Sequence, residues 1–155
     1  MLTKDKILSL PELMKRLRFY RGIGNRIVFT NGVFDILHRG HLAVFEEAKK
    51  HYYHFVVVGI NSDASTRRLK GAGRPIVDER SRAMVIAALV NVDAVVIFNE
   101  DTPLELIEAI QPDILLKGGD YTAEDIVGYG VAGTTRTVPV EEGFSVSSLI
   151  ERIQK

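Results

Sequence analysis

Short apolar runs alternate with segments of helical pattern along the chain. The runs are rich in β-branched and aromatic residues and predict strands at 26–30, 55–60, 94–98, 113–118 and 136–140. Apolar residues three and four apart predict helices near 10–20, 41–51, 79–90, 103–110 and 147–153. Because the strand runs are apolar on both faces, helices should cover both sides of the sheet. The pattern predicts a doubly wound α/β fold with a parallel sheet.

Two long, glycine-rich stretches, 67–78 and 117–135, are predicted to be loops. Each follows a predicted strand, so each should leave the carboxyl edge of the sheet, where open α/β sheets bind ligands. Long loops in compact domains are usually functional. These two stretches are therefore the first candidates for a binding site.

Composition narrows the class of ligand. The 155 residues fit one domain, with a leading helix and linker at 1–25 and an α/β core at 26–155. Twenty basic residues balance twenty acidic ones, so no net charge draws the chain to nucleic acid or to an anionic membrane. The absence of cysteine excludes a thiol nucleophile and a thiolate zinc site. No run resembles a signal peptide or a membrane span, so we expect a cytoplasmic protein that binds small molecules.

The stretch "FDILHRGH" carries the clearest chemical signal. It places His38 and His41 around Gly40, directly after a predicted strand. Gly40 allows a sharp turn, and His41 is expected to open the next helix, where unpaired backbone N–H groups attract phosphate. Such donors can bind a nucleoside triphosphate and stabilise the charge that develops during transfer.

The same histidine pair has two other interpretations, a metal site and a purely structural role. A zinc site of the HExxH kind needs histidines four apart on a helix and a further ligand, whereas these are three apart across a glycine. We therefore predict no metal ligands from the protein. The alternative that the histidines only cap or pack against the helix stays open.

The stretch "TNGVFDILHRGH" resembles the HxGH signature of the cytidylyltransferase-like nucleotidyltransferases. Further along, "VVVGINSDASTRRLKGAGRPI", "PDILLKGGDY" and "VPVEEGFSVSSLIERIQK" follow in the order typical of the branch that makes ADP-heptose. The resemblance implies a Rossmann-like sheet of the HxGH type. It also implies transfer of AMP from ATP to D-glycero-β-D-manno-heptose 1-phosphate, with Mg²⁺ on the phosphates, during lipopolysaccharide core synthesis. A homodimer and a separate kinase that supplies the sugar phosphate are further expectations.

The resemblance also implies roles for individual residues. The predicted catalytic residues are His38, His41, Lys70 and Arg82. The predicted nucleotide-binding residues are Thr30, Asn31, Gly32, Phe34, Gly40, Gly118, Ser145, Ser147 and Ser148. The predicted substrate-binding residues are Asp35, Asn61, Asp63, Lys117, Gly119, Asp120 and Tyr121. For Asp35, a role within the turn is an alternative.

Two departures from the family pattern leave the substrates open. Val146 stands where relatives commonly have threonine, and the 127–135 stretch is shorter than expected. ATP or CTP, and an acceptor such as glycerol 3-phosphate, therefore remain alternatives. So does a nucleotide-binding module without catalytic activity, because fold does not fix function.

Overall fold

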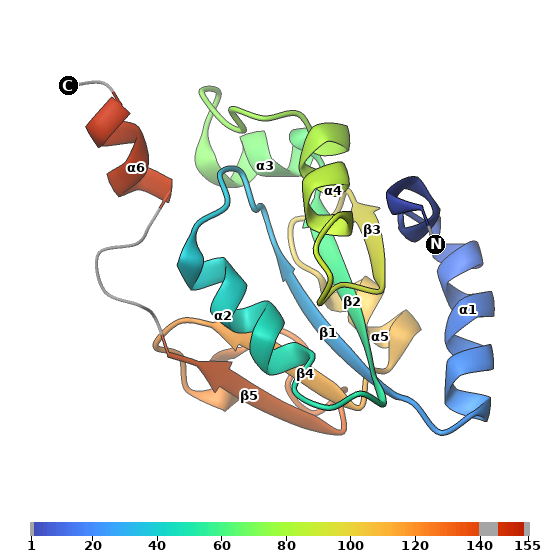
Figure 1. Cartoon of the computed structure of the whole chain (residues 1–155). Helices are drawn as coiled ribbons and strands as arrows, with labels where there is room; N and C mark the ends of the chain where they lie inside the picture. The colour runs from blue at the N-terminus through green and yellow to red at the C-terminus, as the bar shows by residue number, and fades with distance from the viewer. Residues whose placement is uncertain (1, 140–145, 154–155) are drawn as a thin grey trace.

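The computed structural model, which describes residues 2–139 and 146–153, contains a five-stranded parallel sheet (Figure 1). The strands are β1 (Arg26–Gly32), β2 (His54–Asn61), β3 (Ala94–Phe98), β4 (Ile114–Gly118) and β5 (Thr134–Val138). Their order across the sheet is β3-β2-β1-β4-β5, and each neighbouring pair is parallel. The predicted parallel α/β sheet is confirmed.

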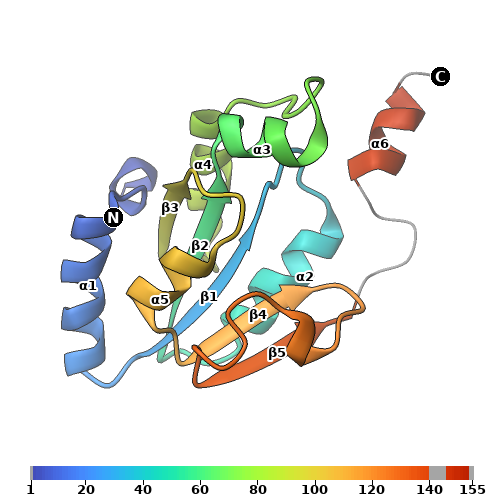
Figure 2. The same cartoon turned by 180° about the vertical axis from the view of Figure 1, so that it is seen from behind.

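Helices cover both faces of this sheet (Figures 1 and 2). The helices are α1 (Leu10–Gly22), α2 (Arg39–Ala48), α3 (Asp63–Lys70), α4 (Glu79–Ala87), α5 (Leu104–Ile110) and α6 (Val146–Ile153), with short 3₁₀ turns η1 (Thr3–Lys6) and η2 (Ala123–Asp125). Helices α2 and α4 bury apolar side chains against one face, and α1 and α5 against the other. The fold is therefore doubly wound, as predicted.

Strand β2 shows why the strands have continuous apolar sequences. All eight of its residues are buried. Val56, Val58 and Ile60 belong to the core under α2 and α4, whereas Phe55 and Val57 belong to the core under α1 and α5. Alternate side chains of a strand point to opposite faces, so a sheet covered on both sides needs apolar residues at every position.

Helix α3 was missed by the sequence prediction, which placed 67–78 in a loop. Its first turn is capped by Ser62, whose hydroxyl accepts the Ser65 N–H at 3.0 Å. The helix buries only Ser65 and Thr66 among its eight residues. Because neither is apolar, the segment has no buried apolar stripe of the kind that usually indicates a helix in a sequence. The connection between helices is thus limited to 71–78.

Other boundaries also differ from prediction. Helix α2 begins at Arg39, with His38 as its N-cap, and not at His41. On this helix Leu42 is 40% exposed, and Val44 is buried in the core. Strand β5 covers 134–138 and so begins two residues before the predicted 136–140, of which residue 140 lies outside the described residues; its pairing with β4 ends at Gly118 and Val138. The next residue, Pro139, has no N–H to extend the ladder.

The leading segment is part of the packed structure. Leu13 and Leu17 of α1 are fully buried, and the Leu8 N–H donates to the carbonyl of Val95 at 2.9 Å. Within residues 2–139 and 146–153, no helix combines the length and hydropathy needed to cross a membrane.

We expect Leu17→Ala to lower the free energy of unfolding by about 2–5 kcal/mol, the range for truncating a fully buried leucine. Phe19→Ala is the matched control on the same helix. Its side chain is 63% exposed, so the change should stay within about 0.5 kcal/mol. Urea denaturation measures both, and equal effects of the two variants would show that α1 is not packed as described.

Candidate active site

A cavity of about 310 Å³ lies at the carboxyl ends of β1 and β4. In the described chain its walls come from the end of β1 and the turn after it, the first turns of α2, the end of α3 and the end of β4. The lining residues are Thr30, Asn31, Gly32, Val33, Phe34, His38, Gly40, His41, Val44, Lys70, Lys117, Gly118, Gly119 and Pro139. The connections that follow β1 and β4 go to opposite faces of the sheet, since α2 packs on one face and the segment after β4 packs Ile126 on the other. The cavity therefore lies at a topological switch point of the sheet.

The cavity brings together many residues predicted from the sequence. These are Thr30, Asn31, Gly32, Phe34, His38, Gly40, His41, Lys70, Lys117, Gly118 and Gly119. The prediction did not include Val33, Val44 and Pro139, which add apolar wall. Val44 lies four residues before buried Ala48 on α2, and this helical spacing is the signal that could have indicated it.

Other predicted residues do not line this cavity. They are Asp35, Asn61, Asp63, Arg82, Asp120 and Tyr121. Ser145 lies outside the described residues, as do the side chains of Ser147 and Ser148 in α6.

The two histidines of the HxGH sequence are stacked on each other. Their ring centroids are 3.8 Å apart and the ring planes differ by 25°. The backbone N–H of His38 donates to Nδ1 of His41 at 3.4 Å, so a neutral His41 carries its proton on Nε2. Phe34 contacts the His41 ring edge to face at a centroid distance of 5.2 Å. His41 is therefore held as a hydrogen-bond donor with a fixed ring.

The turn that presents Phe34 is strained. Phe34 has a φ of 50°, in the left-handed region that non-glycine residues seldom adopt. Its ring is buried and lies so close to Gly32 that a Cβ there would be 3.1 Å from the ring. Gly32 thus leaves room for the aromatic ring that supports His41.

Burial and mutual repulsion set the charge states in the cavity. Burial, with a smaller contribution from His38, lowers the pKa of His41 to about 4. Burial also lowers the pKa of His38. The pKa of Lys117 is lowered by burial and then by the charge of Lys70. A bound polyanion would offset this crowding of cationic groups.

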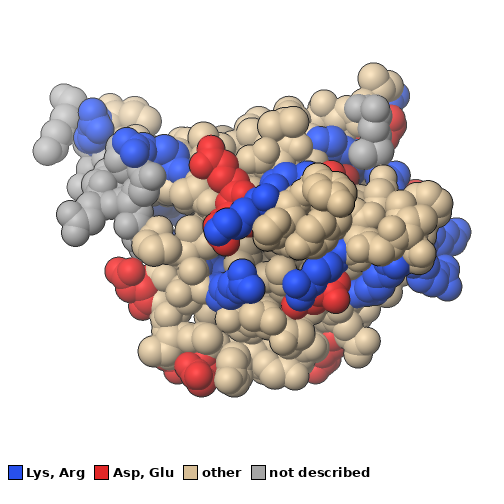
Figure 3. All heavy atoms as spheres, turned by 60° about the horizontal axis from the view of Figure 1, so that its bottom comes forward, with Lys and Arg blue, Asp and Glu red and all other residues tan. Residues whose placement is uncertain are grey.

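Negative charge is missing from the described part of this cavity. None of its lining residues is Asp or Glu. No group of three His, Asp or Glu side chains among the described residues could hold a metal ion. On the face shown in Figure 3, Lys and Arg lie beside Asp and Glu in some places, and most of the visible surface belongs to other residues. A carboxylate-free cavity between two lysines and two histidines is suited to phosphate.

Close packing of α2 on β4 forms one wall. A Cβ on Gly118 would be 2.8 Å from Cγ2 of Val44. Gly119 has a φ of +135°, and a Cβ there would overlap the ring of Tyr121. The paired glycines therefore let both α2 and the chain after β4 approach the cavity closely.

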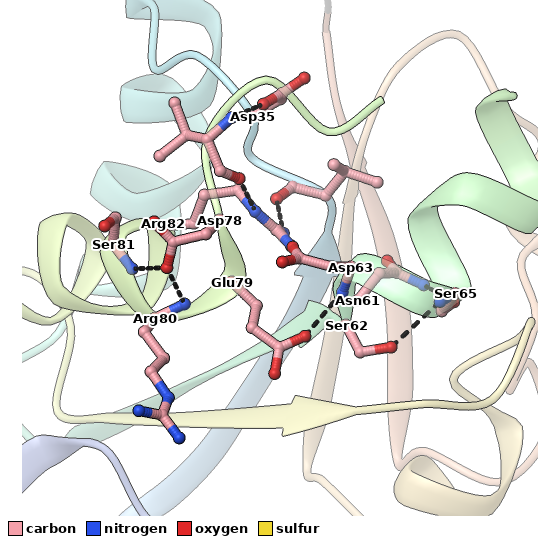
Figure 4. A network of polar contacts seen from close by, with 12 residues as sticks. Asp35, Asn61, Ser62, Asp63, Ser65, Asp78, Glu79, Arg80, Ser81 and Arg82 are labelled. Atoms are coloured by element: carbon pink, nitrogen blue, oxygen red, sulfur yellow. Dashed lines mark hydrogen bonds and ion pairs between the residues drawn. The ribbon is translucent and has the colours of Figure 1, made fainter. Parts of the chain in front are cut away.

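Arg82, for which the resemblance implies a catalytic role, lies behind the cavity and does not line it. It is 1% exposed. Its guanidinium donates to the carbonyls of Val77 (2.8 Å) and Val33 (2.6 Å) and to the carboxylate of Asp63 (2.7 Å; Figure 4). Arg82 thus joins the β1–α2 turn, the 71–78 connection and the start of α3.

Asp35 is also turned away from the cavity, so the alternative of a structural role in the turn describes it better. Its carboxylate accepts from Arg74 Nη1 at 2.7 Å and from the N–H groups of Ile76 (2.8 Å) and Val77 (2.9 Å). Both oxygens are therefore used within the protein.

The remaining residues predicted to bind substrate lie at two other places. Asn61 donates to the Ser65 hydroxyl at 3.0 Å, and the Asp63 N–H donates to Glu79 at 2.7 Å, so both help to start α3. Asp120 and Tyr121 are exposed after β4.

A second, more open hollow of about 610 Å³ lies at the ends of β2 and β3. Its lining mixes Asp63, Asp78 and Glu79 with Arg67 and Arg80. Because acidic side chains repel phosphate, the β1–β4 cavity is the better polyanion site.

Comparison with known proteins agrees with this geometry. A family model described as cytidylyltransferase-like matches residues 29–149, which include most of the cavity wall. Bifunctional protein HldE of Helicobacter pylori strain Shi470 is 50% identical over 153 residues, covering 99% of this chain and 32% of that protein. Bifunctional protein HldE of Nitrobacter hamburgensis is 53% identical over 148 residues, covering 93% of this chain and 30% of that protein. The chain thus spans about a third of the length of these relatives.

A solved structure is also similar to this chain. The lipopolysaccharide core biosynthesis protein from Thermoplasma volcanium superposes with a TM-score of 0.59 and 32% identity. The match covers 76% of this chain and 98% of that one. The predicted family and the predicted class of enzyme, a nucleotidyltransferase, are confirmed. The HxGH turn, the switch-point cavity and these matches agree that the chain belongs to the cytidylyltransferase-like family.

Proposed function

We propose that this chain transfers AMP from ATP to D-glycero-β-D-manno-heptose 1-phosphate, forming ADP-heptose and releasing pyrophosphate. The family implies a nucleoside triphosphate substrate. The observation that carries the proposal is the β1–β4 cavity, which is lined by His38, His41, Lys70 and Lys117 and by no carboxylate of the described chain. The heptose acceptor is supported by the HldE relatives at about 50% identity and by the lipopolysaccharide core neighbour.

The reaction needs no nucleophile from the protein. An oxygen of the sugar 1-phosphate attacks the α-phosphorus, and the bond from that phosphorus to the bridging oxygen of the β-phosphate breaks. Pyrophosphate leaves with the bonding electrons. The chain contributes by aligning the two phosphates and by offsetting the charge spread over their oxygens.

The cationic and N–H groups of the cavity divide this work. Lys70 and Lys117 supply positive charge from two elements, the end of α3 and the end of β4. His38 and His41, at the start of α2, donate hydrogen bonds to phosphate oxygens. Because burial holds both imidazoles below their ordinary pKa, they act as neutral donors at pH 7.

We propose that Mg²⁺ arrives on the triphosphate. The described lining offers no carboxylate ligand for it, so the protein residues seen here do not form a site for the ion. We also propose, from the family resemblance, a cytoplasmic homodimer that binds no nucleic acid. Sedimentation would test the dimer.

A substrate matrix tests the reaction. The pure chain with Mg²⁺ should release pyrophosphate from ATP with heptose 1-phosphate, and much more slowly from CTP or with glycerol 3-phosphate. Release only with CTP and glycerol 3-phosphate would contradict the proposal. Calorimetric binding of ATP with no turnover on any sugar phosphate would favour a non-catalytic module.

His38→Ala and His41→Ala should each lower kcat by about 10²–10³-fold, because each removes a donor to the charge that develops in the transition state. His51→Ala is the matched control, since this histidine is exposed and outside the cavity. Circular dichroism checks that each variant is folded. Unchanged turnover in both cavity variants would exclude the role assigned to the pair.

Protonation of His41 should make the fold less stable in acid. Its folded pKa of about 4 is below the ordinary value of 6.5, so between these values the unfolded chain binds more protons. The free energy of unfolding should therefore fall as the pH decreases from about 6.5 towards 4. His41→Asn should flatten this dependence in denaturation curves measured across that range. An identical slope in the variant would show that His41 is not the depressed group.

A further inference from the structure

We propose that the ion pair between Asp35 and Arg74 is a positioning device that holds Lys70 at the cavity. This inference rests on one part of the proposed function, namely that the β1–β4 cavity binds a polyphosphate. Neither Asp35 nor Arg74 lines the cavity, so both act through another residue.

The anchor is largely buried. The Asp35 side chain is 3% exposed and that of Arg74 is 17% exposed, and their charged atoms are 2.7 Å apart. The other Asp35 oxygen accepts the N–H groups of both Ile76 and Val77. One carboxylate therefore fixes the segment 74–77 at three points.

The chain between this anchor and Lys70 has little support of its own. Lys70 is the last residue of α3, and Gly71–Gly73 are exposed. A Cβ added at Gly71 or at Gly73 would meet no atom within 4 Å. The Arg74 N–H donates to the Gly71 carbonyl at 3.1 Å, which closes a short turn directly after Lys70. Glycine backbone is flexible, so this segment alone does not hold the end of α3 in place. A fixed Arg74 therefore limits how far the end of α3 can move.

The anchor also ties Lys70 to the opposite wall of the cavity. Asp35 follows Val33 and Phe34, which line the cavity and support His41. Phe34 is in a strained conformation, so the turn is set by its surroundings. The ion pair of Asp35 and Arg74 therefore fixes the distance between the wall that holds the histidines and the wall that holds Lys70.

A simple effect of charge predicts the opposite result for one variant. Asp35 is an anion near a cavity for anions, so its neutralisation alone should strengthen polyphosphate binding. If Asp35 positions Lys70, its neutralisation should weaken binding. The sign of the change separates the two mechanisms.

The test is a double-mutant cycle with inorganic tripolyphosphate as the probe, measured by calorimetry on the full chain. Lys70→Met should raise Kd about tenfold, the scale of one lost charge-assisted hydrogen bond. Asp35→Asn and Arg74→Gln should each raise Kd about threefold or more, and Arg74→Lys less. In the Lys70→Met background, Arg74→Gln should change Kd by less than about twofold. Arg74 acts on binding through Lys70, so the effects of the two substitutions should not add.

Arg67→Gln is the matched control. Arg67 is also on α3, but it is exposed and lines the hollow at the ends of β2 and β3 and not the cavity, so the Kd of this variant should stay at the wild-type value. Thermal unfolding identifies any variant that is not folded at the assay temperature, and Asp35→Asn and Arg74→Lys provide the test if Arg74→Gln unfolds.

Additive effects of Arg74→Gln and Lys70→Met, or tighter binding by Asp35→Asn, would overturn the positioning role. Absence of tripolyphosphate binding by the wild type would also overturn it. Failure of the proposed function is a different result, in which the wild type binds tripolyphosphate but makes no ADP-heptose.

Discussion

The parallel pairing of β1 with β4, through Val28 with Ile114 and Phe29 with Leu115, brings together the two strand ends between which the cavity lies. On one side of this pair the chain leaves β1 and forms α2, which packs on one face of the sheet. On the other side the segment after β4 packs Ile126 on the opposite face. The divergence opens a space at the carboxyl ends of the two strands. The close approach of Val44 to Gly118 limits that space on one side.

The site has two layers with different kinds of interaction. The inner layer carries two neutral donors, His38 and His41, and two cations, Lys70 and Lys117, whose charges are offset by no carboxylate in the described lining. The layer behind it contains Asp35 and Arg82, which are buried and bonded to other protein groups. The charges of this second layer are paired, Asp35 with Arg74 and Arg82 with Asp63, and these pairs join the loops behind the cavity. The two lysines of the inner layer have no such partner in the described lining, and a bound polyphosphate would supply one.

The sequence was sufficient for the features that depend on local pattern. The apolar runs predicted the strands because both faces of the sheet are covered, and the HxGH stretch predicted the cavity wall at the start of α2. Helix α3 could not be found in this way, since it buries two polar residues and no apolar stripe. The positions of the Asp35 and Arg82 side chains could not be predicted from the sequence either. Their partners Arg74 and Val33 are 39 and 49 residues away, so only the tertiary structure shows which groups their charges meet.

The most direct test of this account is a crystal structure of the chain with a non-hydrolysable ATP analogue and Mg²⁺. The account predicts that the triphosphate lies in the β1–β4 cavity, with its oxygens within hydrogen-bond distance of His38, His41, Lys70 and Lys117. Asp35 and Arg82 should keep their protein partners in that complex. A triphosphate bound instead in the hollow between the ends of β2 and β3, beside Arg67 and Arg80, would contradict the account.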